Sequence, residues 1–134
     1  MCENVVGYYR TSSQSNVGTD KDSRKRQKHS VETYTKSNNM NLVKEFYDEG
    51  VSGTKEILNR PSFMEMMSYC EDEDISVIVF EDSSRMSRDL VIMETGFQYL
   101  TGLGYKLISV SNPDTFIEIT PTGTLIRQVL GVIS

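Results

Sequence analysis

The stretch Val5-Val6-Gly7-Tyr8-Tyr9-Arg10-Thr11-Ser12-Ser13 decides how the rest of the chain is organised. Its first half is rich in β-branched and aromatic residues, which favour a strand, and Gly7 is the only weak point. The second half turns to hydroxyl side chains, so the strand presents polar groups at its carboxyl edge. Side chains alternate along a strand, which predicts that Tyr8, Arg10 and Ser12 share one face. In open parallel α/β sheets, ligands bind at that edge.

Two interpretations of Arg10 beside Ser12 are open at this point. A guanidinium next to a hydroxyl at a sheet edge can hold a phosphate beside an attacking oxygen. An arginine near the end of a strand is also a common solvated surface residue. The choice between them depends on what the other strands bring to the same edge.

Composition sets broad limits on the function. The chain has 134 residues, 37% hydrophobic and 25% charged, which is typical of one soluble globular domain. Its net charge of −5 argues against coating nucleic acid by bulk charge, although a local basic site is compatible with it. Cys2 and Cys70 are far apart and indicate free thiols in a reducing, cytoplasmic compartment.

The same totals argue against several classes of site. With one histidine and no Cys/His cluster, we expect no metal site. The chain starts without an apolar signal segment, and no apolar run approaches the ~18 residues of a membrane span. We therefore expect no membrane partner.

Strand and helix patterns alternate about four times along the chain. Further strands are predicted at 41–47, 75–80 and 105–110, with a short edge strand at 115–120. The first predicted helix is capped by Asp20, Asp22 or Ser23 and ends at Ser37. The second follows a cap at Asn59, and the third runs from Met86 to Leu100. The last helix begins at Pro121. The second helix has a core-facing stripe of Phe63, Met66, Met67 and Cys70. This alternation predicts an α/β fold, a mostly parallel four- to five-stranded sheet with helices on both faces.

Chemically useful residues collect where the predicted strands end. They are Arg10 and Ser12, the segment 48–52 with Arg60 beyond it, and Arg85 with Arg88. Arginines around a serine, without a histidine, do not form a hydrolase triad. Guanidinium groups suit phosphate oxygens and can stabilise a five-coordinate phosphorus, while nearby positive charge activates the hydroxyl. The pattern favours phosphoryl transfer through a phosphoserine, and the alternative is that these arginines pair with the 19 acidic residues.

Four motifs resemble those of the serine recombinases, the resolvase/invertase family, over essentially the whole chain. They are Tyr8-Tyr9-Arg10-Thr11-Ser12, Asp48-x-Gly50-x-Ser52-Gly53 with Asn59-Arg60-Pro61, Ser84-Arg85-Met86-Ser87-Arg88, and Asp114-Thr115 before Thr122-Gly123. Each motif alone is short, but their common order is specific. The resemblance implies a resolvase-like catalytic domain.

The resemblance also implies roles for individual residues. Ser12 is the expected nucleophile and forms a 5′-phosphoserine link with DNA. The expected phosphate-holding residues are Arg10, Arg60, Arg85 and Arg88. Tyr8, Gln27, Ser52 and Asp82 are expected to line the substrate site. Because the covalent link conserves the bond energy for religation, no cofactor is expected.

The partners implied by the family are double-stranded DNA and other copies of the chain. Members dimerise through the last long helix and form a tetramer in the synaptic complex. That helix would carry the apolar stripe Leu125, Ile126, Val129, Leu130 and Ile133. The stripe stops at the end of the chain without a cap, so we expect 1–134 to be a catalytic domain cut near the start of this helix, without its DNA-binding region.

Two features depart from the family pattern. The residue before Arg85 is usually aspartate but is Ser84 here, and Asp82 is the candidate to replace it. The spacing from Ser12 to Gln27 exceeds that of small resolvases and resembles the large serine recombinases of phages and mobile elements. Two other interpretations stay open: an arginine-rich phosphatase-like domain, and a non-catalytic module that dimerises or associates with DNA.

Overall fold

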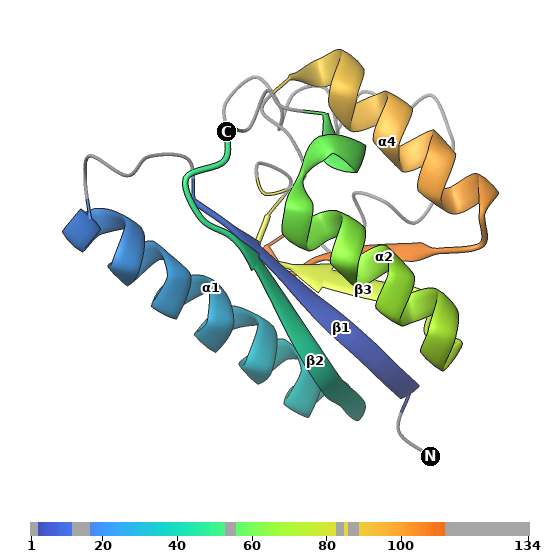
Figure 1. Cartoon of the computed structure of the whole chain (residues 1–134). Coiled ribbons are helices and arrows are strands. Elements are labelled where there is room, and N and C mark those ends of the chain that lie inside the picture. Colours follow the sequence, from blue (N-terminus) through green and yellow to red (C-terminus); the bar gives the residue numbers. More distant parts are fainter. Residues whose placement is uncertain (1–2, 12–16, 53–55, 83–84, 86–88, 112–134) are drawn as a thin grey trace.

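The fold is described from a computed structural model that defines residues 3–11, 17–52, 56–82, 85 and 89–111; for 17–22 and 90 only the backbone is described. Within these residues, four strands form one sheet in which every neighbouring pair is parallel (Figure 1). The strands are β1 (Glu3–Arg10), β2 (Met40–Asp48), β3 (Val77–Phe80) and β4 (Lys106–Ser109), in the order β2-β1-β3-β4. The predicted α/β class is confirmed, and the edge strand predicted at 115–120 lies outside the described residues.

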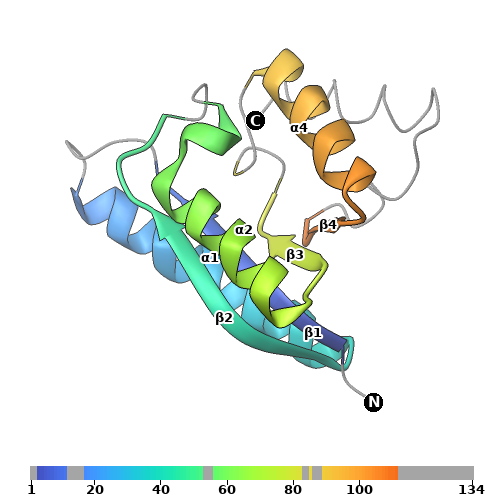
Figure 2. The ribbon, with the colours of Figure 1, turned by 45° about the vertical axis from the view of Figure 1, so that its right-hand side comes forward.

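Helices cover both faces of this sheet, as predicted (Figures 1 and 2). One face carries α1 (Val17–Ser37), and the other carries α2 (Pro61–Glu73), α4 (Leu90–Gly102) and the 3-10 helix η1 (Ile57–Asn59). The chain passes from β1 outward to β2 and then back across the sheet to β3 and β4. Because crossovers between parallel strands share one hand, this reversal places α1 opposite α2 and α4.

Two apolar layers hold the helices against the sheet. The larger layer packs Val6, Tyr8, Ile78 and Phe80 of the sheet against α2 and α4. The predicted stripe of α2 lies in it, with Phe63, Met66 and Cys70 buried and Met67 partly buried. The smaller layer packs Val31 of α1 against Val5, Tyr9, Val77, Val79 and Ile108. All four residues of β3 are buried, as expected for a strand covered on both faces.

The centre of the sheet contains a topological switch point. β1 and β3 are neighbours there, and the chain leaves β1 toward α1 but leaves β3 toward the face that carries α4. Open α/β sheets bind ligands outside the carboxyl ends of such a strand pair. The residues around Arg10 and Glu81 occupy this position.

Three predicted helix starts are wrong. The helix predicted from Met86 is α4, which begins only at Leu90, because Asp89 is extended and caps it. α1 begins at Val17, before all three residues predicted as its cap, because acidic residues are also favourable inside the first turns of a helix. Asn59 does not cap α2, since it belongs to η1 and Arg60 occupies the cap position without a side-chain cap bond. The Asp48 carboxylate, at the end of β2, accepts instead from the backbone N–H of Ser62 at 2.8 Å and of Phe63 at 3.1 Å.

Among the described residues, no helix combines the length and the apolar character needed to cross a bilayer.

Candidate active site

Arg10, the last residue of β1, is fully buried. Its Nη1 donates to the carbonyl oxygen of Val51 at 2.8 Å, in the loop after β2. Thr11 ties the same two segments together, because its N–H donates to the carbonyl of Asp48 and its carbonyl accepts from the N–H of Val51. The interpretation of Arg10 as a solvated surface arginine is therefore wrong.

Arg60 and Arg85 join Arg10 at this edge of the sheet. Arg85 Nη1 donates to the carbonyl oxygen of Arg10 at 2.9 Å, and Arg60 Nη1 donates to the carbonyl oxygen of Arg85 at 2.9 Å. Arg60 has no exposed surface and Arg85 is 8% exposed. Three arginines separated by 25 residues or more along the chain are thus linked through main-chain oxygens.

Carboxylates are also present at this edge of the sheet. Arg85 Nη2 lies 3.3 Å from Glu81 Oε1, and Arg85 Nε lies 3.9 Å from Asp82 Oδ1. Arg26 of α1 donates two hydrogen bonds to the Glu81 carboxylate, from Nε at 2.8 Å and from Nη2 at 3.1 Å. Hydrogen bonding to Glu81 raises the pKa of Arg26, so this guanidinium stays charged. The alternative that arginines pair with acids therefore holds in part, at Arg85.

Arg85 Nε has a further property that points to a ligand. This atom is buried and forms no hydrogen bond within the described part of the chain. Leaving a buried donor unpaired is costly, and native structures do so rarely. An anion at the carboxyl ends of β1 and β3 would satisfy such a donor.

Tyr8 connects Arg60 to the end of β2. Its hydroxyl donates to Asp48 Oδ2 at 2.8 Å and accepts from Arg60 Nη1 at 3.4 Å. Burial raises the pKa of Tyr8, against the opposing effect of Arg60, so the group remains a neutral phenol. Tyr8 also packs edge-on against Phe63, with ring centroids 5.1 Å apart. The predicted substrate-site residue Tyr8 thus supports the position of Arg60.

Gln27, for which the family resemblance implied a position near the site, lies beside Arg10. Its side-chain amide is fully buried, accepts from Arg10 N–H at 3.0 Å and donates to the Arg10 carbonyl at 3.1 Å. A second donor bond runs to Ser23 Oγ at 3.1 Å. Gln27 therefore fixes α1 to the end of β1.

The remaining predicted site residues fall into two groups. Ser52 is exposed and Asp82 is half-buried beside Arg85. Ser12 and Arg88 lie outside the described residues, so their positions stay predictions. Sequence reasoning assigned no role to Asp48, Glu81 or Arg26. Asp48 opens the motif Asp48-x-Gly50-x-Ser52-Gly53, which could have identified it. No sequence pattern indicated Glu81 or Arg26.

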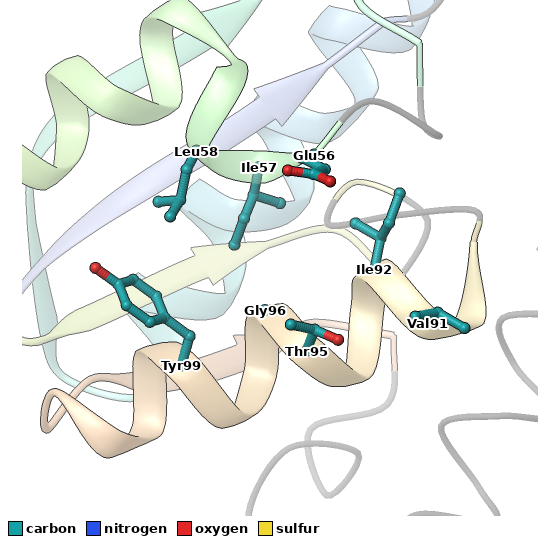
Figure 3. Close-up of a pocket in the computed structure, with 8 residues that line it drawn as sticks. All are labelled: Glu56, Ile57, Leu58, Val91, Ile92, Thr95, Gly96 and Tyr99. Atoms are coloured by element: carbon teal, nitrogen blue, oxygen red, sulfur yellow. The ribbon is translucent and has the colours of Figure 1, made fainter.

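A separate apolar hollow of about 240 Å³ lies between η1 and α4 (Figure 3). Ile57, Val91, Ile92 and Tyr99 supply much of its lining, and none of the predicted site residues borders it. Helix α4 comes close to η1 at Gly96, where an added Cβ would lie 2.8 Å from Ile57 Cδ1. This apolar lining does not suit a phosphate, so the arginine cluster remains the candidate site.

Comparison with known proteins gives one family and several similar folds. The model of the family "Resolvase, N terminal domain" matches residues 5–134. The N-terminal catalytic domain of TP901-1 integrase superposes with a TM-score of 0.74 at 20% identity, over 98% of this chain and 93% of that one. A resolvase family site-specific recombinase from Streptococcus pneumoniae gives 0.70 at 23% identity, over 98% and 85%.

A third similar structure is the C-terminal catalytic domain of ISC1926 TnpA, an IS607-like serine recombinase. Its TM-score is 0.65 at 19% identity, over 97% of this chain and 80% of that one. At these identities the structures demonstrate a shared fold. Among curated proteins, nothing matches the chain.

Proposed function

Because the chain belongs to the resolvase N-terminal domain family, we propose that it is the catalytic domain of a site-specific DNA recombinase. Ser12 attacks a DNA phosphodiester and forms a covalent 5′-phosphoserine link, which a later attack by a DNA hydroxyl reverses to rejoin strands. Arg10, Arg60, Arg85 and Arg88 hold the scissile phosphate and stabilise its transition state.

The observation that carries this proposal is the convergence of three buried guanidiniums beneath the end of β1. Arg10, Arg60 and Arg85 come from three separate segments and are buried. Arg85 donates to the main-chain carbonyl of Arg10, and Arg60 donates to that of Arg85. Ser12 is two residues after Arg10, whose carbonyl accepts from Arg85. We propose that the Ser12 hydroxyl attacks the phosphate that this cluster binds.

The proposed reaction balances without an external energy source. A bond forms between Ser12 Oγ and phosphorus while the bond between phosphorus and the 3′ oxygen breaks. The serine proton leaves as Oγ attacks, and the departing 3′ oxygen takes up a proton, for which an arginine N–H is a suitable donor. Since one phosphodiester is exchanged for another, the reverse step needs only the new 3′ hydroxyl.

The partners in this proposal are double-stranded DNA and further copies of the chain. The net charge of −5 supports the proposal that a region outside residues 1–134 recognises the DNA sequence. We propose a homodimer that pairs into a tetramer for strand exchange. The similarity to the TP901-1 integrase domain supports a recombinase of the large serine type.

Incubation of the protein with DNA fragments from the regions that flank its gene tests this function. We expect a protein–DNA adduct that resists denaturation, is absent in Ser12→Ala and persists in the matched control Ser13→Ala. The adduct is read on denaturing gels with end-labelled DNA.

The same assay separates the other candidate functions. Release of inorganic phosphate without an adduct would favour the phosphatase-like alternative. DNA binding with neither product would favour a non-catalytic module. Either result would overturn the proposal.

A further inference from the structure

Glu81 lies between two arginines that come from different parts of the fold. Its Oε1 is 3.3 Å from Arg85 Nη2 and 3.1 Å from Arg26 Nη2, and its Oε2 is 2.8 Å from Arg26 Nε. The side chains of Glu81 and Arg85 are only 11% and 10% exposed. Solvent therefore screens the attraction between these two groups weakly.

Asp82 is the competing carboxylate. Its Oδ1 lies 3.9 Å from Arg85 Nε, and its side chain is 32% exposed. The longer distance and the greater access of water both weaken its interaction with Arg85 relative to that of Glu81. Position 84 carries a serine, so a carboxylate for Arg85 has to come from elsewhere in the turn after β3.

The main chain and side chain of Glu81 are both held in place. Its carbonyl oxygen accepts from the N–H and the hydroxyl of Ser111, at 3.0 and 2.6 Å. Arg26 clamps the carboxylate through a two-pronged hydrogen bond, a geometry that fixes direction as well as distance. Arg26 also offsets the negative charge that Glu81 would otherwise present to a phosphate. The carboxylate is thus in position before any substrate arrives.

We propose that Glu81 is the positioning residue of Arg85, taking the place of the carboxylate missing at Ser84. It holds the guanidinium against the Arg10 carbonyl, in the orientation required for the scissile phosphate. A guanidinium has five N–H donors, and the bonds to Arg10 and Glu81 leave others for phosphate oxygens. The phosphate part of this inference rests on the proposed function, whereas the ordering of Arg85 does not.

The test compares Glu81→Gln with Asp82→Asn, because each removes one negative charge at nearly constant size. One readout is the ¹⁵N NMR spectrum of the Arg85 guanidinium, whose Nη signals separate when its bond rotation is hindered. The other is the rate of adduct formation at saturating DNA, with the DNA concentration for half-saturation measured in parallel.

We expect the Arg85 Nη signals to merge in Glu81→Gln and the rate to fall about 10–100-fold, with half-saturation unchanged. Asp82→Asn keeps separate signals, and its rate falls less than that of Glu81→Gln. Glu81→Asp, which restores the charge on a shorter side chain, recovers part of the rate. If Glu81 only stabilised the fold, its substitution would not lower the rate while leaving the DNA concentration for half-saturation unchanged.

Separate Arg85 signals and a full rate in Glu81→Gln would overturn the inference, as would a larger effect of Asp82→Asn. If Glu81→Gln shows no thermal unfolding transition and is therefore unfolded, the NMR signals and the rate are measured in Glu81→Asp instead. A Glu81→Asp rate equal to that of the parent then overturns the inference. If the parent protein forms no adduct, the proposed function fails, and the NMR signals still report whether Glu81 orders Arg85.

Discussion

Arginine side chains are seldom removed from water as completely as Arg10 and Arg60, which have no exposed surface. Burying a charge is costly unless hydrogen bonds and opposite charges compensate for it. The hydrogen bonds of Arg10 Nη1 and Arg60 Nη1 run to main-chain carbonyls and to the Tyr8 hydroxyl. These two Nη1 atoms therefore donate to neutral acceptors.

At the scale of single residues, Arg85→Ala is expected to lower the rate of adduct formation about 10²–10³-fold. The substitution removes a charged donor that is held at the end of β1. Glu81 keeps Arg26 as its partner, so the fold is expected to survive. The rate is measured by quenching the reaction at intervals and resolving the adduct on denaturing gels.

Lys36→Ala is the control for this variant. Lys36 is exposed in the last turn of α1 and the substitution removes one positive charge far from the cluster. We expect its rate to match the parent. An Arg85→Ala protein that cuts DNA at the normal rate would show that this arginine has been assigned wrongly.

The sequence predicted that Arg10, Arg60 and Arg85 lie at one sheet edge, but not which groups hold them there. Arg10, Arg60 and Arg85 were predicted together because each follows a strand end or opens a helix near one. The contact of Glu81 with Arg26 depends on where α1 lies relative to the end of β3. No local sequence pattern predicts that position. Tyr8 and Gln27 were expected to line the substrate site, and their hydrogen bonds to Asp48 and to the main chain of Arg10 were not predicted.

At the scale of elements, the start of α2 depends on a carboxylate from another element. Asp48, which is 2% exposed, accepts from two N–H groups of the first turn of α2 and from the Tyr8 hydroxyl. We expect Asp48→Ala to lower the free energy of unfolding by about 2–4 kcal/mol. Urea unfolding followed by circular dichroism measures the loss.

Asp89 offers a matched comparison, because it caps α4 locally and accepts from the N–H of Val91 and of Ile92. Its side chain is only half-buried, so Asp89→Ala is expected to cost about 1 kcal/mol. Equal losses in the two variants would mean that the carboxylate of Asp48 has no special role.

Most elements could be predicted from periodicity, but their ends depended on distant groups. The apolar spacing of α2 located its buried face, and the continuous apolar run of β3 predicted burial on both sides. The predicted Asn59 cap failed because η1 takes up that residue and Asp48 supplies the acceptors. A cap that comes from a neighbouring strand leaves no signal in the helix sequence itself.

At the scale of the whole molecule, the order β2-β1-β3-β4 assembles the site. It puts β1 between β2 and β3, so the ends of three strands lie side by side and each contributes to one cluster. The alternation of strands and helices predicted that the strand ends meet at one edge of the sheet. The hydrogen bonds of the buried arginines could be known only from the fold. The last predicted helix lies outside the described residues.

Stability is expected to fall in alkaline solution. Burial raises the pKa of the Cys70 thiol from an ordinary 9.0 to about 11, and burial also raises the pKa values of Tyr8 and Tyr9. A raised pKa in the folded state means that the unfolded chain loses its proton first as pH rises. The Cys70 contribution is therefore complete below pH 9 and disappears by about pH 11.

Urea unfolding at several pH values between 8 and 11.5, with linear extrapolation to zero urea at each pH, measures this effect. Cys70→Ala is the control. We expect the parent to lose about 1–3 kcal/mol more than Cys70→Ala over this range. Parallel curves for the two proteins would show that the thiol does not titrate as its burial requires.

The most direct test of the central claim is to identify the residue that becomes joined to DNA. The adduct is digested with nuclease and protease, and mass spectrometry locates the remaining nucleotide on the peptide. We expect a 5′-linked nucleotide on Ser12 alone. A nucleotide on any other residue, Ser13 included, would contradict it.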